Sequence, residues 1–417
     1  MKVIVLGGEV ASVYAIHWLR KLDPVSRVEL IADTEYPGYL RSLLPYVALG
    51  DLGVDRCTLY PRPFLRDVLR VASRARLDGV AVRGKVVEVG GEEREFDKLL
   101  MATGVEARRL ALGNAVPLER PEDALALREK LESARAVGIV GGVYGLDIAL
   151  LLAERGFQVS VYYDGETGLS TVFDRDVERV IRDVLHGYDV KFRELDLHKL
   201  GLEDLAILRG FTRPKVPRIE GVRTGRLGGV IVDEYMETSA KDVYAAGAVA
   251  EVSSESGITF THLSDSLSML QGLVAAFNIA GRRRRADFRA PLFAVGSKDL
   301  LMASVGHTSS RLSSAGVDVV AVRHHFRAGD PVFGGSRGDL HIKVVAERKT
   351  REVKGVQVVG RGGGMAEILL ALSAIARKST IDDFLSMPSA YVPGISRVVA
   401  PFLASCYGLW RKLYRAI

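Results

Sequence analysis

The sequence predicts an α/β protein with two Rossmann-like nucleotide-binding domains, followed by a carboxy-terminal α+β domain. Two observations lead to this fold class. A strand, a double glycine, a helix and a second strand follow one another near the amino terminus, and the same order returns from residue 136. A duplicated unit of this kind indicates two nucleotide-binding folds with parallel sheets. The 417 residues are enough for two or three domains with separate cores.

The first unit begins with a predicted strand from Lys2 to Leu6. Gly7 and Gly8 form a turn, a helical pattern runs from Val10 to Leu22, and a second strand spans Val28 to Ile31. This order is one strand–turn–helix–strand unit of a dinucleotide-binding fold.

The second unit repeats the same order. Ala136 to Val140 is the predicted strand, Gly141 and Gly142 are the turn, Leu146 to Arg155 is the helix, and Phe157 to Tyr163 is the next strand. The repeat predicts a second nucleotide-binding domain rather than an extension of the first.

A basic run from Arg282 to Arg285 marks the next boundary and is interpreted as a solvated linker. Strand-like runs follow at Leu340 to Val345 and at Val356 to Val359, and a helix is expected from Met365 to Ile375. This composition is typical of an α+β module.

The bulk composition narrows the function classes. The net charge of +6 and the pI near 9.2 are mild for this length, so charge alone does not indicate nucleic-acid binding. Cys57 and Cys406 form no metal-ligand pattern, and the histidines show no metal spacing, so no metal site is expected. We expect a reduced, cytoplasmic protein without a signal peptide or a membrane span. Few Asn and Gln residues beside abundant Arg and Glu suggest a thermophilic source.

Both glycine turns are incomplete versions of GxGxxG, in which glycines let the backbone approach a pyrophosphate at a helix N-terminus. Leu6 and Val140 stand at the first glycine position, whereas Ala11 and Gly145 supply the small residue that ends each motif. Glu9 is the larger departure, because its carboxylate would stand near a pyrophosphate unless it points away. The alternative interpretation is a tight turn that binds nothing.

The segment from Glu35 to Tyr46 carries a more specific signal. It resembles the FAD-dependent pyridine nucleotide-disulfide oxidoreductases, in the branch of coenzyme A disulfide reductases and NADH oxidases. In that family the segment reads tyrosine, two residues, cysteine, glycine, leucine, proline, tyrosine, and here Ser42 stands at the cysteine position. A serine is scarcely ionised near neutral pH and forms neither a disulfide nor a sulfenic acid. The sequence therefore predicts a member without disulfide chemistry, whose catalytic residues are unknown.

The resemblance implies FAD and NAD(P)H as cofactors and assigns further candidate residues. Acids that follow the second strand of each unit would contact a ribose, although the family position lies one residue earlier, at Ala32 and Tyr163. Ala248 stands where the family has an aspartate that binds the flavin ribityl chain. The cofactor-binding candidates are Gly7, Gly8, Ala11, Asp33, Ala102, Thr103, Gly104, Gly141, Gly142, Gly145, Asp164, Gly247 and Ala248.

Two further residues are carried over from the family. Arg20 resembles a position that contacts coenzyme A phosphates, and Tyr391 matches a tyrosine placed near the partner subunit's active site. The alternatives are a solvated arginine and an interface aromatic residue. The resemblance also implies a homodimer built from three domains. These are an FAD-type domain (1–112 and 226–285), an NAD(P)-type domain (113–225) and a dimerisation domain (286–417).

Three functions remain open from the sequence. The first is a flavoenzyme that transfers electrons from NAD(P)H to oxygen, a quinone or another small acceptor. The second is a cofactor-poor relative that works as a nucleotide- or coenzyme A-binding or scaffold protein, favoured by Glu9, Ala32, Ser42 and Ala248. The third is a quinone reductase that contacts a membrane peripherally through the aromatic and basic tail from Phe402 to Tyr414.

Overall fold

The computed structural model describes all residues except 62–71, 75–76, 78–80, 288, 328–337, 394–395 and 415–417. The chain forms two compact units. Unit 1 comprises Met1–Gly141, Asp196–Ser253 and Thr259–Ala286, and unit 2 comprises Gly142–Leu195, Ser254–Ile258 and Asp287–Ile417. The division into three domains with the boundaries given above stays a prediction.

Unit 1 is built on a five-stranded parallel sheet with the order β17-β7-β1-β2-β3. The inner residues of its central strands are apolar and buried, as expected for a parallel sheet covered on both faces, whereas most of the charged side chains stand at the strand starts. The first and second strands lie where the sequence predicts them. The strands are β1 (Lys2–Leu6), β2 (Arg27–Ala32), β3 (Ala72–Arg74), β7 (Lys98–Met101) and β17 (Val243–Ala245).

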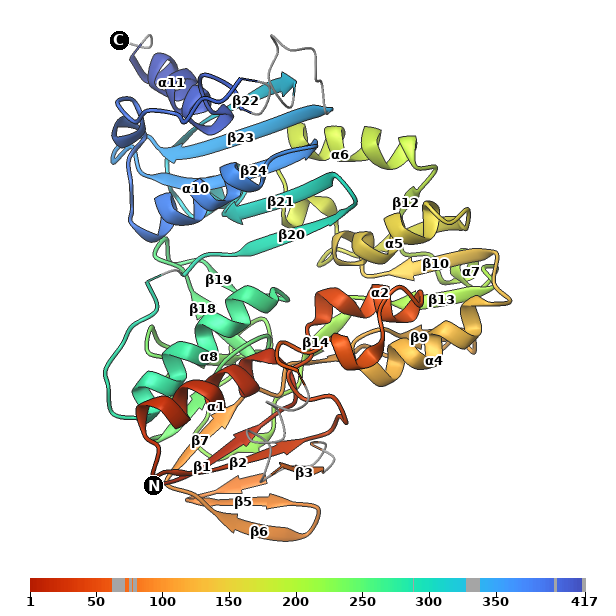
Figure 1. The fold of residues 1–417 in the computed structure, drawn as a ribbon, viewed down its shortest axis with the longest axis vertical. Helices are drawn as coiled ribbons and strands as arrows, with labels where there is room; N and C mark the ends of the chain where they lie inside the picture. The colour runs from red at the N-terminus through yellow and green to blue at the C-terminus, as the bar shows by residue number, and fades with distance from the viewer. Residues whose placement is uncertain are drawn as a thin grey trace. The chain divides into compact units, whose positions relative to one another are not determined.

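Two helices, α1 (Val10–Leu22) and α8 (Asp265–Ile279), lie side by side in unit 1 (Figure 1). They approach closely because Gly272 has no side chain, and a Cβ there would collide with the carbonyl oxygen of Ala11. The glycine at position 272 therefore allows α8 to pack directly against the first turn of α1.

Smaller sheets complete this part of unit 1 (Figure 1). One has the order β15-β4-β5-β6, a second joins β16, β18 and β19, and β8 pairs with β14. Their strands are β4 (Ala81–Arg83), β5 (Val86–Val89), β6 (Glu92–Glu95), β8 (Val105–Ala107), β14 (Thr212–Pro214), β15 (Arg218–Ile219), β16 (Val230–Val232), β18 (Ala250–Ser253) and β19 (Thr259–Phe260).

The rest of unit 1 contains a parallel strand set and several helices. Strand β13 pairs with β10 on one side and with β9 on the other. The elements are η1 (Arg41–Leu43), α2 (Leu44–Ala48), η2 (Val54–Arg56), β9 (Ala115–Pro117), α4 (Pro121–Leu131), β10 (Ala136–Val140), α7 (Leu197–Leu200) and β13 (Leu205–Leu208).

In unit 2 the helix and the following strand of the second repeat are present, with ends that differ from the predicted ones by one or two residues. Strand β11 pairs in parallel with β12. The predicted helix ends at Ala153 instead of Arg155, because the chain turns there before β11. The elements are η3 (Gly142–Gly145), α5 (Leu146–Ala153), β11 (Gln158–Tyr163), η4 (Leu169–Thr171), α6 (Arg175–Gly187) and β12 (Lys191–Glu194).

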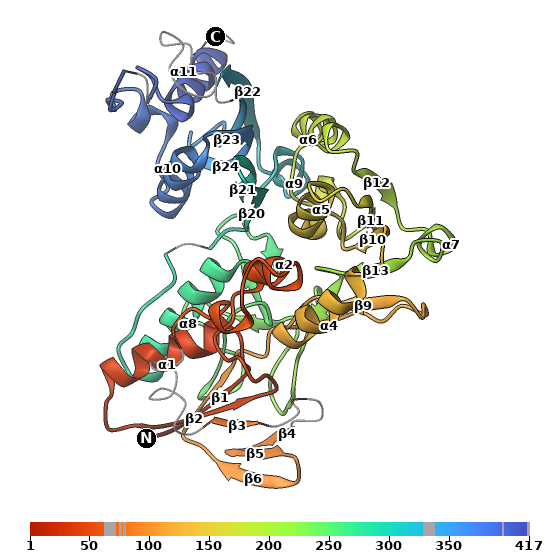
Figure 2. The ribbon, with the colours of Figure 1, turned by 45° about the vertical axis from the view of Figure 1, so that its right-hand side comes forward.

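The carboxy-terminal part of unit 2 is the expected α+β module. Its antiparallel sheet has the order β20-β21-β24-β23-β22, and α10 (Met365–Ala376) and α11 (Pro401–Tyr414) cover one face of it (Figure 2). The remaining elements are β20 (Leu292–Ser297), β21 (Leu300–Gly306), α9 (Ser309–Ser314), β22 (Val319–Arg327), β23 (Asp339–Glu347), β24 (Val353–Arg361) and η5 (Ile381–Phe384).

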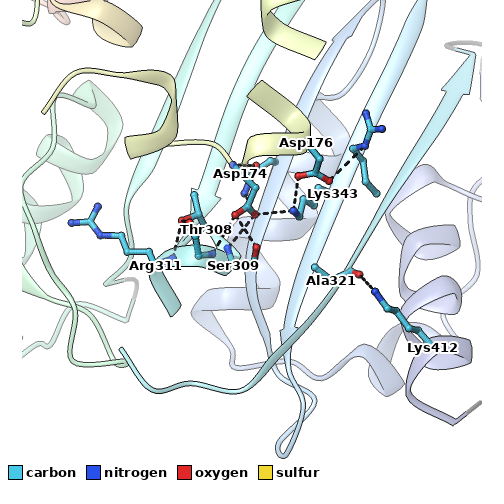
Figure 3. Close-up of polar contacts among 11 residues, drawn as sticks. Asp174, Asp176, Thr308, Ser309, Arg311, Ala321, Lys343 and Lys412 are labelled. Carbon is cyan, nitrogen blue, oxygen red and sulfur yellow. Dashed lines mark hydrogen bonds and ion pairs between the residues drawn. The ribbon is translucent and has the colours of Figure 1, made fainter. Parts of the chain in front are cut away.

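A buried polar cluster holds the start of α6 against this sheet (Figure 3). Asp174 accepts hydrogen bonds from Ser309 N (3.1 Å) and Ser309 Oγ (2.8 Å), and from Gln357 Nε2 (2.9 Å). Lys343 Nζ lies 3.1 Å from Asp174 Oδ2 and 2.7 Å from Asp176 Oδ1. Burial alone would raise the pKa of Asp174, but the Ser309 hydrogen bonds and the Lys343 charge hold that pKa below its usual value.

The aromatic and basic tail forms α11, which packs on its own sheet. Phe402, Leu403, Cys406 and Leu409 are buried in the core of the module, and Lys412 Nζ donates to the carbonyl oxygen of Ala321 at 3.0 Å (Figure 3). No helix in the described part of the chain is long and apolar enough to cross a membrane.

Candidate functional site

The first glycine turn connects β1 to α1 and requires the absence of side chains. Gly7 has a φ of +121°, and a Cβ there would collide with the carbonyl oxygen of Ala102 at the end of β7. A Cβ at Gly8 would collide with the side chain of Thr34. The turn is therefore as tight as a dinucleotide-binding turn must be.

The N-terminus of α1 directly follows the turn formed by Gly7 and Gly8. Glu9 is its N-cap residue, but its side chain does not cap the helix. The N–H of Ser12 donates to the carbonyl oxygen of Glu9 at 3.2 Å, so the amides of Val10 and Ala11 are the first-turn donors left for an anion. Asp33 follows β2, and its carboxylate lies 2.7 Å from Lys215 Nζ. The structure thus brings Gly7, Gly8 and Asp33 together, as the sequence predicts.

These residues surround a cavity of about 170 Å³. Acidic side chains outnumber basic ones in its lining, because five carboxyl groups face only two cations. The lining residues are Gly8, Glu9, Asp33, Tyr39, Thr103, Val105, Glu106, Ala107, Pro117, Glu119, Arg120, Asp123 and Lys215.

The Glu9 carboxyl group is buried in this cavity. The residue is 8% exposed, and its carboxyl group fills the space beside Gly104 that a Cβ would need. Tyr39 donates its hydroxyl hydrogen to Glu9 Oε1 across 3.4 Å. Burial raises the pKa of Glu9 to about 7; the negative charges of Asp265 and Asp33 add to this, while Arg41 and the Tyr39 hydrogen bond oppose it.

Ser42 lies on the exposed surface of η1 and is bound to the first turn of α8. Its hydroxyl donates to Asp265 Oδ2 at 2.6 Å, and its backbone N–H donates to the same oxygen at 3.0 Å. The N–H of Arg41 donates to Asp265 Oδ1 at 3.1 Å. The position expected to carry a redox cysteine therefore holds a serine hydrogen-bonded to a carboxylate.

A buried charge network lies behind η1. Arg41 and Glu119 form an ion pair with side chains 5% and 4% exposed. Glu119 also accepts from the N–H of Gly210 at 2.7 Å, and Arg209 donates to the carbonyl oxygens of Leu118 (3.0 Å) and Arg41 (2.9 Å). This network ties η1 to the segments around residues 118 and 210.

The other predicted residues of unit 1 lie at two strand ends. The hydroxyl of Thr103 donates to the carbonyl oxygen of Lys215, and Gly104 has a φ of +65°. The N–H of Gly247 donates to Gln271 Oε1 at 2.8 Å, whereas Ala248 is 2% exposed and offers no polar side-chain group.

The second glycine turn also leaves no space for side chains, because backbone carbonyl oxygens lie against Gly141 and Gly142. In unit 1, a Cβ at Gly141 would collide with the carbonyl oxygen of Arg209. In unit 2, a Cβ at Gly142 would collide with the carbonyl oxygen of Thr167, which already accepts the N–H of Val143 at 2.8 Å. This amide therefore donates within its own loop in the described conformation.

Asp164 is engaged in the same loop. Its Oδ1 accepts from Glu166 N (3.0 Å), Thr167 N (3.0 Å) and Thr167 Oγ1 (2.9 Å). Gly145 ends η3 directly before α5 and is buried. Asp164 thus stabilises a turn, and a ribose hydroxyl would have to bind Asp164 in addition to these three hydrogen bonds.

Two predicted residues are not among those that line this cavity. Arg20 lies in the last turn of α1, at the opposite end of the helix from Glu9. Tyr391 belongs to unit 2, where it is 39% exposed. Neither lines the cavity described above.

Several residues of the site carry no sequence signal. Asp265 reaches Ser42 across 223 positions, and Lys215 reaches Asp33 across 182. Tyr39 lies in the segment from Glu35 to Tyr46, but its contact with Glu9 depends on how the chain returns to the glycine turn. No cluster of three or more potential metal ligands occurs among the described residues.

Comparison with known proteins decides the family. The sequence model named pyridine nucleotide-disulphide oxidoreductase matches residues 1–196, and the model of the dimerisation domain of the same family matches residues 294–399. The chain belongs to the pyridine nucleotide-disulphide oxidoreductases. This confirms the resemblance and the fold class.

Relatives of similar length are found in this family. A protein of Pyrococcus horikoshii named NAD(P)H coenzyme A polysulfide/persulfide reductase is 28% identical, over 96% of this chain and 97% of its own. An NADH oxidase of Lactococcus lactis subsp. cremoris is 24% identical, over 72% of this chain and 73% of its own. The structure of a NAD-dependent persulfide reductase from A. fulgidus superposes with a TM-score of 0.87 at 22% identity, covering 100% of this chain and 84% of that one. The Pyrococcus relative supports the expectation of a thermophilic source.

Members of this family are flavin-dependent NAD(P)H oxidoreductases, which confirms the enzyme class and the cofactors that the sequence predicts. The residues of unit 1 fit FAD at the first glycine turn. That turn has no side chains, the helix N-terminus has no side-chain cap, and Asp33 follows the second strand. Glu9 lines the same cavity and is compatible with this fit as a neutral acid, because burial raises its pKa to about 7 and a neutral carboxyl group does not repel a pyrophosphate.

Proposed function

We propose that the chain is an FAD-dependent NAD(P)H:acceptor oxidoreductase that reduces a small molecule without cysteine chemistry of its own. The hydrogen bond from Ser42 Oγ to Asp265 Oδ2, at 2.6 Å, carries this proposal. Ser42 stands at the position where the family resemblance predicts the redox cysteine. Its hydroxyl group forms neither a disulfide nor a sulfenic acid.

Neither of the two cysteines replaces the missing thiol. Cys57 is 0% exposed, and burial raises its pKa to about 11. Cys406 lies in the core of unit 2, and burial raises its pKa to about 12. Both thiols stay protonated near neutral pH, so neither is a nucleophile or a redox partner.

The residues of the chain would bind and orient the cofactors. When bound, FAD accepts a hydride from NAD(P)H and gives electrons to an acceptor. The open N-terminus of α1 would hold the FAD pyrophosphate beside Gly7, Gly8 and Ala11, and Asp33 would accept a ribose hydroxyl. We assign Ala102, Thr103, Gly104, Gly247 and Ala248 to the surrounding wall of that site. Gly141, Gly142, Gly145 and Asp164 are assigned to NAD(P)H.

An anaerobic titration of the FAD-loaded protein with NADH tests the proposal. Full bleaching of the flavin absorbance should take one NADH per flavin, because no thiol stores a second electron pair. Oxygen, a quinone and polysulfide are then compared as acceptors; polysulfide is included because of the Pyrococcus relative. Ser42→Ala should leave the stoichiometry unchanged. Consumption of a second NADH per flavin would contradict the proposal.

A second candidate function is a cofactor-poor nucleotide- or coenzyme A-binding protein. It is favoured by the size of the cavity at the first glycine turn, because about 170 Å³ is less than the roughly 300–1,000 Å³ of small-molecule sites. Adding FAD to the purified protein distinguishes the two. A protein that stays colourless and takes up no FAD would favour this candidate, and coenzyme A and NADH binding should then be measured.

The assembly and location are proposed together with the main function. The matched dimerisation domain at residues 294–399 supports a homodimer, and we propose a cytoplasmic location. Peripheral membrane contact through α11 is the remaining alternative. Trp410 and Tyr414 are 38% and 43% exposed beside Arg411 and Lys412. Flotation with liposomes, comparing the natural chain with a Trp410→Ser, Tyr414→Ser variant, tests it without removing the buried residues of the helix.

A further inference from the structure

Glu9 is placed where its charge would act directly on an anion bound at the N-terminus of α1. It is the N-cap residue of a 13-residue helix and does not cap it with its own side chain. The carboxyl group instead turns towards Gly104 and lines the cavity, where the residue is 8% exposed. Any pyrophosphate held by the first-turn amides would lie near this carboxyl group.

No cation neutralises Glu9 among the described residues. Arg41 is the cation that acts on it most, but Arg41 is committed to the buried ion pair with Glu119. Tyr39 makes the single hydrogen bond to the carboxyl group, and this bond is 3.4 Å long. Two further carboxylates act on Glu9, Asp265 from α8 and Asp33 from the end of β2.

These surroundings make the protonated acid accessible at physiological pH. Burial, followed by the charges of Asp265 and Asp33, raises the pKa of Glu9 to about 7, against the opposing effect of Arg41. As a carboxylate, Glu9 repels a pyrophosphate in a site shielded from water. As a neutral acid, it loses that repulsion and gains an O–H that can donate to a phosphate oxygen.

We propose that Glu9 admits FAD only as the neutral acid, so that binding of the dinucleotide at the first glycine turn takes up one proton at this residue. The inference rests on the proposed function, because it concerns the same FAD site. Proton uptake makes the apparent affinity fall with rising pH. Between pH 6 and pH 8 the loss should be on the order of tenfold for a group that titrates near 7.

Isothermal titration calorimetry of the full-length apoprotein with FAD tests this inference. Titrations in phosphate and in Tris, whose ionisation enthalpies differ, give the number of protons taken up for each FAD bound. We expect roughly half a proton at pH 7 and nearly one at pH 8. For Glu9→Gln we expect no uptake and an affinity that is equal at pH 6 and pH 8.

Glu106→Gln is the matched control. Glu106 lines the same cavity, but it is 38% exposed and pairs with Arg213, so its removal should leave the proton uptake unchanged. FAD binding by the natural chain without proton uptake would overturn the inference while leaving the proposed function intact. Uptake that persists in Glu9→Gln would also overturn it. Absence of FAD binding by the natural chain and by Glu9→Gln at both pH values would overturn the proposed function and the inference together.

Discussion

The hydroxyl of Ser42 donates to Asp265 Oδ2 across 2.6 Å, so the position at which the sequence predicts a redox cysteine for this family faces a carboxylate. A thiol at this place would have to ionise beside a negative charge. An adjacent like charge raises the pKa of a thiol above its ordinary value of about 8.5. A cysteine introduced at position 42 alone would therefore still lie beside the carboxylate of Asp265.

We expect that Ser42→Cys alone gives an exposed but weakly reactive thiol. Its reaction with a chromogenic disulfide reagent should be slow at pH 7, and the combined Ser42→Cys, Asp265→Asn variant should react several-fold faster. The natural chain serves as the control, since Cys57 and Cys406 are buried. Equal thiol pKa values in the two variants, taken from the pH dependence of the reaction rate, would refute this account.

The buried ion pair between Arg41 and Glu119 gives a second prediction. Glu119→Gln should lower the free energy of unfolding by about 3–5 kcal/mol, because Arg41 is left buried without its counter-charge. Urea unfolding measures the change. Glu106→Gln removes a partner of Arg213, whose side chain is 70% exposed, and should change stability by less than about 1 kcal/mol. If both variants lost a similar amount of unfolding free energy, the burial of the Arg41–Glu119 pair would not explain the cost.

Asp174 provides a pH-dependent prediction. Its pKa is lowered in the folded protein, where hydrogen bonds from Ser309 and the charge of Lys343 outweigh the effect of burial. Its contribution to stability is therefore fully present above the unfolded pKa of about 3.9 and is lost as the pH falls through the folded pKa. Asp174→Asn should cost about 3 kcal/mol near pH 7 and remove this part of the acid sensitivity.

The measurement for Asp174 is urea unfolding of the natural chain and of Asp174→Asn between pH 7 and pH 3. Asp176→Asn is the matched control, because Asp176 also contacts Lys343 but has a side chain that is 38% exposed. That variant should lose less than about 1 kcal/mol. A stability difference between the natural chain and Asp174→Asn that stays constant down to pH 3 would contradict the assignment.

The fold was predictable from local patterns, whereas the site depends on long-range contacts. The strand at Lys2–Leu6 and the helix at Val10–Leu22 are found at the predicted residues, because a buried apolar run and a glycine turn determine both locally. The Ser42–Asp265 bond joins residues 223 positions apart, and no local pattern encodes it. The direction of the Glu9 side chain likewise depends on Gly104 and Tyr39, which come from other segments of the chain.

A last prediction separates the two aspartates that follow the second strand of each repeat. Asp33 faces the cavity and pairs with Lys215 at 2.7 Å, whereas Asp164 accepts three hydrogen bonds from its own loop. Asp33→Asn should weaken FAD binding by about tenfold, since a charge-assisted acceptor for a ribose hydroxyl is lost. Asp164→Asn should leave FAD binding unchanged and act mainly on stability. Quenching of flavin fluorescence gives both affinities, and a loss of FAD affinity in Asp164→Asn that matches the loss in Asp33→Asn would contradict the separate roles.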